Sequence, residues 1–168
     1  MIDFLQNGTL GDLKLGVGRR NILTKLGRPQ NWSGKPPTFG PHILSPEQSD
    51  VWIYYGDAAG IRFGENGEAI EVNVCPSKID RRSTPFLGWP FGPGAKMSDL
   101  REFIVQNGLP FSEGAESPEV YYILVNKRCV ALCLPYEDQQ LVPTGDREIK
   151  IICHFARVSD LPGFVSVS

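Results

Sequence analysis

The sequence predicts an α+β protein made of two tandem repeats, each a helix followed by an antiparallel meander of strands, with the helices on one side of the sheet. Three observations support this prediction. The stretches NILTKLGRPQ, beginning at Asn21, and EFIVQNGLPF, beginning at Glu102, are apolar-periodic and both end in Gly-x-Pro. Each is followed by strand-like segments that turn residues separate. The apolar content of 41% over 168 residues is typical of a globular chain with a sizeable core.

The first helix is expected in RRNILTKLG. Ile22, Leu23 and Leu26 recur at helical spacing and form one apolar face. Gly27 follows, and glycine readily adopts the left-handed conformation that ends many helices. Pro29 then prevents the helix from continuing. We therefore predict that this helix ends at Gly27.

Three strands are expected after the first helix, and a long loop precedes them. The strands run over Val51–Gly56, Ala59–Gly64 and Ala69–Cys75. The dipeptide Asn66-Gly67 is the strongest short signal for a tight hairpin. Residues 30–50 are rich in Pro, Gly and Ser, so we expect a loop there.

The second helix is expected in SDLREFIVQNGLP. Its apolar face contains Leu100, Phe103 and Ile104. Asp99 starts it in a capping-box arrangement with Glu102, and Gly108 ends it.

Strands again follow this second helix. Two lie in EVYYILVNKRCVALCLP, about a tight turn at Asn126-Lys127, and a third lies in REIKIICHFARV. The shared order of elements is the repeat signal, and we predict that residues 18–75 and 98–155 superpose. Two unrelated α+β halves are the alternative.

The domain organisation follows from these repeats. Residues 1–80 form the first repeat, including the Pro-rich loop 30–50, and residues 90–168 form the second. Residues 81–89, within another Pro/Gly-rich stretch, connect them.

Composition and charge narrow the function classes. The formal net charge is −2 and the pI is 5.7, whereas a nucleic-acid-binding protein usually has a basic face and a high pI. The apolar runs are too short for a membrane-spanning helix, and the opening stretch MIDFLQNGTLGDLKLG lacks the regions of a secretory signal. We expect a cytoplasmic protein that binds neither nucleic acid nor membrane, and the oligomeric state stays open.

The four cysteines are Cys75, Cys129, Cys133 and Cys153. An even number allows disulfides, but without a secretory signal reduced and mostly buried thiols are favoured. Cys129 and Cys133 lie four residues apart on an expected strand, about 13 Å from each other, too far to share one zinc ion. We expect no metal and no cofactor.

No catalytic constellation is evident. The two histidines are His42, in the long loop, and His154, on the last strand, and no Ser-His-Asp order, HExxH, Walker A loop or nucleophile elbow accompanies them. An enzyme is therefore the least favoured class, behind a binding protein.

Exposed aromatic side chains are the better candidates for function. Trp32 and Phe39 lie in the long polar loop. Because neighbours on a strand point to opposite faces, one of Tyr54 and Tyr55, and one of Tyr121 and Tyr122, should lie on the outer face of the sheet. Tyr and Trp on an open face are favoured anchors of protein interfaces, whereas core packing is expected for Trp52 and Trp89.

Alternation also places polar residues on that outer face. In AIEVNV, Ile70, Val72 and Val74 should face the helix, so that Glu71 and Asn73 face away. In IKIICHF, Lys150, Ile152 and His154 should face away as well. The predicted partner-binding residues are Trp32, Phe39, Tyr54, Tyr55, Glu71, Asn73, Tyr121, Tyr122, Ile152 and His154.

One stretch resembles a known family. LKLGVGRRNILTKLGRPQ, followed by WIYYGDAAGIRFGENGEAIEV, resembles the outer-membrane assembly lipoproteins of the SmpA/OmlA type and the β-lactamase inhibitory proteins. It also resembles bacterial cytoplasmic proteins presumed to be immunity proteins of polymorphic toxins. The resemblance implies a tandem repeat of a helix plus four strands, whose concave sheet grips an enzyme. It implies a bacterial immunity protein that occludes a toxin; a small-ligand-binding or regulatory module is the alternative.

Overall fold

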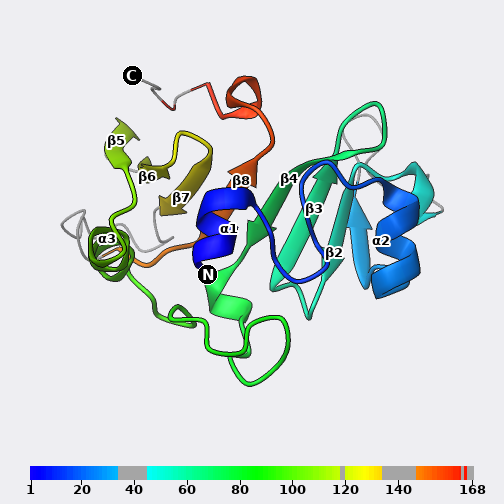
Figure 1. Cartoon of the computed structure of the whole chain (residues 1–168), viewed down its shortest axis with the longest axis horizontal. Helices are drawn as coiled ribbons and strands as arrows, with labels where there is room; N and C mark the ends of the chain where they lie inside the picture. Colours follow the sequence, from blue (N-terminus) through cyan, green and yellow to red (C-terminus); the bar gives the residue numbers. More distant parts are fainter. Residues whose placement is uncertain (34–44, 118–119, 134–146, 164, 166–168) are drawn as a thin grey trace.

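The computed structural model describes residues 1–33, 45–117, 120–133, 147–163 and 165 (Figure 1). Eight strands form one open antiparallel sheet in the order β1-β2-β3-β4-β8-β7-β6-β5. The strands are β1 (Asn31–Ser33), β2 (Val51–Tyr54), β3 (Ala59–Phe63), β4 (Ala69–Val74), β5 (Phe111–Ser117), β6 (Val120–Val125), β7 (Cys129–Cys133) and β8 (Ile151–Phe155). The α-helices of the described residues are α1 (Ile2–Asn7), α2 (Arg19–Leu26) and α3 (Met97–Gln106), and 3₁₀ turns span Pro46–Gln48, Pro76–Lys78 and Val158–Asp160.

The α+β class is confirmed, and the six predicted strands are present. Two strands form in addition to the predicted six: β1, which contains Trp32 and lies in the stretch expected as a loop, and β5, which occupies FSEGAES. From either edge to the centre, four strands follow one another in chain order: β1 to β4 on one side and β5 to β8 on the other. The last strand of each set, β4 or β8, pairs with the other at the centre of the sheet. Each set of four strands is preceded by one helix, α2 or α3.

α2 ends where the sequence predicts. Its C-cap is Gly27, with φ 74° and ψ −164°, and the N–H of Gly27 donates to the carbonyl of Leu23 at 2.9 Å. Of the expected apolar face, Ile22 is fully buried in the core, whereas Leu23 and Leu26 are partly buried and pack against the core.

α3 begins earlier than predicted. Lys96 is its N-cap, and the carboxylate of Asp99, in the third helical position, accepts the Lys96 N–H at 2.8 Å. Asp99 is therefore the second member of a capping pair, and the prediction that it starts the helix is wrong. The helix ends at Gln106, and Gly108 follows with φ 64°.

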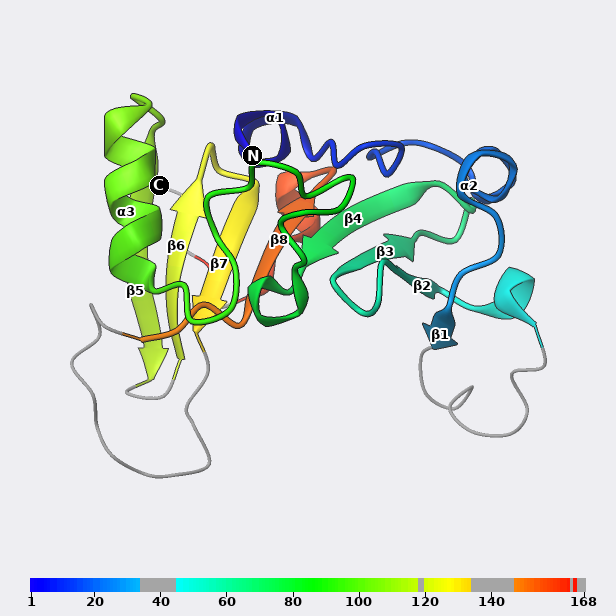
Figure 2. The same ribbon diagram turned by 90° about the horizontal axis from the view of Figure 1, so that it is seen from below.

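One apolar core fills the space between the helices and the inner face of the sheet. A single row of paired residues crosses all eight strands on this face: Trp32, Trp52, Ile61, Val72, His154, Cys129, Val125 and Phe111. All three helices contribute buried side chains to the core, and α1 lies between α2 and α3 along the sheet (Figure 2).

The stretch expected as a connection also belongs to this core. Phe86 and Trp89 are buried and pack edge-on, with ring centroids 5.4 Å apart. Trp89 in turn packs against Phe4 of α1, with ring centroids 5.7 Å apart. The core placement of Trp52 and Trp89 is confirmed.

A second, smaller apolar cluster lies on the opposite, outer face of β6, β7 and β8. It contains Tyr122, Leu124, Val130, Cys153 and Phe155, together with Val165 from the C-terminal segment. Leu132, Ile151 and Leu161 pack against it. Val165 and Leu161 of the C-terminal segment thus pack against this part of the outer face. In the part of the chain that the structure describes, no helix is long and apolar enough to cross a membrane.

Candidate binding surface

The outer face of β2, β3 and β4 carries a charged network. The Arg62 Nε donates to the Glu71 carboxylate at 2.7 Å, and the Asn73 amide donates to its other oxygen at 3.1 Å. Only 13% of the Glu71 side chain and 29% of the Arg62 side chain are exposed. The outward orientation predicted for Glu71 and Asn73 is confirmed.

Strand register arranges apolar side chains beside this network. Val51 is paired with Arg62, and Ile53 with Gly60, which in turn is paired with Asn73. We call the outward residues Val51, Ile53, Arg62, Glu71 and Asn73 the polar face. All five are half-buried, and none belongs to either apolar cluster.

Gly60 lets the Asn73 amide lie flat on the sheet. A methyl group at Gly60 would come within 2.6 Å of Oδ1 of Asn73. The absence of a side chain at this position therefore leaves the space in which the Asn73 amide lies while it donates to Glu71.

The polar face meets the covered half of the sheet at Cys153, the partner of Asn73 on β8. The thiol is buried, and burial together with the nearby Glu71 carboxylate raises the pKa of Cys153 well above that of an ordinary thiol. It is therefore a poor nucleophile.

The aromatic residues near β2 do not lie on the outer face. Tyr54 is in the core, where its hydroxyl donates to the Gly27 carbonyl at 3.2 Å and burial raises its pKa to about 12. Tyr55 leaves the strand with φ 57° and packs edge-on against Phe86. The expectation that one of this pair faces outward is wrong, because the strand ends at Tyr54.

Trp32 also faces inward, as the partner of Trp52. It is half-buried, and the Arg28 guanidinium lies over its ring, 5.2 Å from the centroid. Phe39 and His42 lie outside the described residues.

The second tyrosine pair divides between the two faces, as predicted, but neither residue is exposed. Tyr121 faces α3, and its hydroxyl lies beside Arg101 and Glu113. Arg101 also forms a double hydrogen bond with Glu113, at 2.5 and 2.8 Å. Tyr122 is in the outer apolar cluster. The first group fastens α3 to the edge strand β5, which is a structural role.

Ile152 and His154 are on the opposite side from the one predicted. Ile152 is fully buried and His154 is 1% exposed, both on the inner face. Alternation alone could not place them, because β8 is apolar on both faces. The pairing decides: His154 lies opposite Val72, and Ile152 opposite Val74, on the inner face of β4.

Ile70 also departs from its predicted orientation. The register shifts between Arg62 and Phe63, so that Phe63 pairs with Ala69 and Arg62 with Glu71. Ile70 is the extra residue of this irregularity and is half-buried outside the core.

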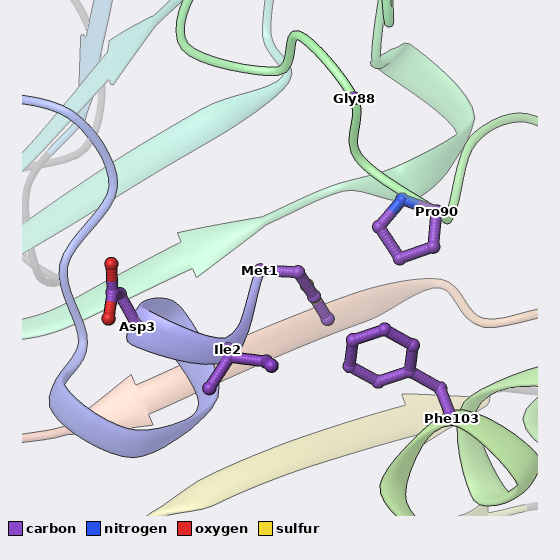
Figure 3. Close-up of a pocket in the computed structure, with 6 residues that line it drawn as sticks. All are labelled: Met1, Ile2, Asp3, Gly88, Pro90 and Phe103. Atoms are coloured by element: carbon purple, nitrogen blue, oxygen red, sulfur yellow. The ribbon is translucent and has the colours of Figure 1, made fainter. Parts of the chain in front are cut away.

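A shallow hollow of about 370 Å³ lies between α1, α3 and the segment around Gly88 (Figure 3). The side chains of Met1, Pro90 and Phe103 gather there, while Asp3 lies apart from them. The lining side chains are mostly apolar, and Asp3 is the charged one among them.

Cys129 and Cys153 are buried free thiols, and Cys75 is a half-buried free thiol. Among the described residues, no group of His, Cys, Asp and Glu side chains is arranged to hold a metal ion. The sequence analysis missed Arg62, Val51 and Ile53, although alternation from the buried Trp52 and Ile61 places all three outward.

Comparisons with protein-family models, with curated proteins and with solved structures find no match to this chain.

Proposed function

We propose that this chain is a non-enzymatic binding protein that occludes a partner protein through its polar face, and that it acts as a cytoplasmic bacterial immunity protein against a toxin. The observation that carries the proposal is the difference between the two halves of the outer face. One half is apolar and packs with Val165 and Leu161 of the C-terminal segment. The other carries the half-buried Arg62–Glu71–Asn73 network with Val51 and Ile53 beside it.

Such a surface suits a protein partner. Interfaces combine an apolar centre with a polar rim, and fixed charges select partners and guide their approach. Arg62 and Glu71 are already paired and partly desolvated. Their side chains are held in place before binding, which lowers the entropic cost of association.

A tandem duplication would explain the architecture, and backbone contacts support it. In the first half, the N–H of Ala69 donates to the carbonyl of Val17 at 3.1 Å. The N–H of Arg19 donates to the carbonyl of Gly67 at 3.2 Å. These bonds tie the start of α2 to the hairpin that leads into β4.

The second half contains the same pair of bonds. The N–H of Ile149 donates to the carbonyl of Ala95 at 2.8 Å, and the N–H of Met97 donates to that of Arg147 at 2.9 Å. They tie the start of α3 to the segment that leads into β8.

The central seam has matching symmetry. Under the duplication, Val72 corresponds to Ile152 and Val74 to His154. If each residue of the pair Val72–His154 is replaced by its counterpart in the other half, the result is the pair Ile152–Val74. Both pairs are present between β4 and β8. A two-fold axis would pass between Asn73 and its partner on β8.

The duplication also accounts for the polar face. Glu71 and Asn73 occupy the positions that Ile151 and Cys153 occupy in the second half. The second-half residues are apolar because the C-terminal segment covers them, whereas the first-half residues meet solvent or a partner.

The binding proposal is tested by recovering the partner and scanning the polar face. The tagged chain is used to recover one stoichiometric protein from its own cell extract, and affinities are then measured for Ile53→Ala, Arg62→Ala and Glu71→Gln. At least one variant should weaken binding by about thirtyfold, which corresponds to about 2 kcal/mol.

Arg20→Ala is the matched control, because Arg20 is an exposed arginine of α2, outside the polar face. It should leave the affinity unchanged. If all three polar-face variants bind within about threefold of the parent protein, the surface has been assigned to the wrong part of the molecule.

A further inference from the structure

The helix α1 rests on a buried histidine. His154 lies on the inner face of β8, and its ring meets that of Phe4 edge-on, with centroids 6.3 Å apart. A methyl group on Gly8, where α1 ends, would lie 3.0 Å from Nδ1 of His154. The imidazole is therefore enclosed beneath the last turn of α1.

Neither ring nitrogen of His154 has a hydrogen-bond partner among the described residues. The backbone of Leu5, Gln6 and Phe155 lies beside the ring, but no contact there has the geometry of a hydrogen bond to a ring nitrogen. Burying an imidazole without partners is costly when it is neutral and more costly when it is charged.

The surrounding side chains offer no counter-charge. Arg128, beside β7, is the charged group that acts on the ring, and it opposes a second positive charge. The strand partners of His154 are the buried thiol of Cys129 and the apolar Val72. Asp3, the carboxylate of α1, is exposed. Burial lowers the pKa of His154 and outweighs the backbone of Gln6, Phe155 and Leu5, which acts in the opposite direction, while Arg128 adds to the lowering.

α1 is attached to the rest of the protein through its side chains. Within the described residues, its backbone hydrogen bonds stay inside the helix and its cap. Its attachment comes from Phe4 and Leu5, which are buried in the core. A helix of six residues does not persist alone in water, so α1 depends on this contact.

We propose that α1 and His154 form a proton-controlled latch, in which protonation of His154 releases α1 and uncovers the inner face around Trp89. The imidazolium regains hydration only when α1 moves away, so the charge drives the opening. Linkage between protonation and opening sets the direction in which stability changes with pH. A histidine with a lowered pKa in the closed state contributes stability that is complete above about pH 6.5 and is lost as the pH falls.

Amide hydrogen exchange of the full chain tests the latch. After correction for intrinsic rates, opening of residues 2–8 should increase by up to about tenfold between pH 7.5 and 5.5, while the amides of α3 keep their protection. His154→Leu should abolish the increase. His42→Gln, which removes the other histidine, should retain it.

Three results would overturn the latch: constant protection of residues 2–8 over this range, an equal loss of protection in α3, or the same pH dependence in His154→Leu. If His154→Leu does not fold, His154→Gln takes its place, because it also lacks a titrating group. The imidazole resonances of His42→Gln give an independent reading: a titration midpoint at or above about 6.5 in the closed protein contradicts the proposal.

Discussion

Replacing Gly27 by alanine should destabilise the protein through its backbone alone. Gly27 has φ 74° and ψ −164°, a combination that residues with a side chain almost never adopt. A methyl group there would meet nothing within 4 Å, so steric crowding contributes nothing. We expect Gly27→Ala to lower the free energy of unfolding by about 2 kcal/mol.

Part of this loss should pass through Tyr54. The Gly27 carbonyl accepts the hydrogen bond of the buried Tyr54 hydroxyl, and a change in the backbone at Gly27 would reorient that carbonyl. Tyr54→Phe alone should cost about 1 kcal/mol. In the Gly27→Ala background, Tyr54→Phe should lower the free energy of unfolding by less, because the hydrogen bond between Tyr54 and residue 27 is already weakened.

Urea unfolding of the four proteins in this cycle gives the free energies. Gly18→Ala is the control, since Gly18 caps the other end of α2 with φ −73° and also has nothing within 4 Å of an added methyl group. It should change stability by less than about 1 kcal/mol. A loss no larger for Gly27→Ala than for Gly18→Ala would show that the Gly27 conformation does not limit stability.

Two further predictions concern α3 and the cysteines. Arg101→Gln should lower the free energy of unfolding by about 1 kcal/mol, because the double hydrogen bond from Arg101 to Glu113 is only partly exposed to water. The control Arg20→Gln on α2 should change it little. Equal losses for the two variants in urea unfolding would show that the Arg101–Glu113 contact does not stabilise the protein. Under native conditions iodoacetamide should modify Cys75 before Cys129 and Cys153, since burial raises the pKa of both buried thiols, and peptide mass spectrometry showing the reverse order would contradict their burial.

Local signals in the sequence predicted the elements that they govern. The turn at Asn126-Lys127 was predictable because both residues tolerate a positive φ better than β-branched residues do, and they adopt φ 50° and 58°. The end of α2 was predictable from Gly27. The edge strands β1 and β5 were not, since NWS and FSEGAES show no apolar alternation and form strands only beside β2 and β6.

Orientation failed where it depended on distant parts of the chain. β8 has apolar side chains on both faces, so alternation along the strand could not show which face is the inner one. Only its pairing with β4 turned Ile152 and His154 inward. Phe155 and Cys153 pack with Val165 and Leu161, which no periodicity in β8 could reveal. Arg62 and Glu71 form one site because a register shift next to Arg62 aligns them.

The pairing of β4 with β8 has a consequence for how the chain folds. Every other strand pair of the sheet joins strands that are neighbours in the sequence, and each closes a shorter loop than the β4–β8 pair, at a lower entropic cost. The β4–β8 contact must instead enclose the whole stretch from β5 to β7. Each half-sheet can therefore form before the two meet, and we expect the contacts around Asn73 to be among the last to form. The polar face lies wholly on β2, β3 and β4, so a partner that binds it would find these residues in place before this final step.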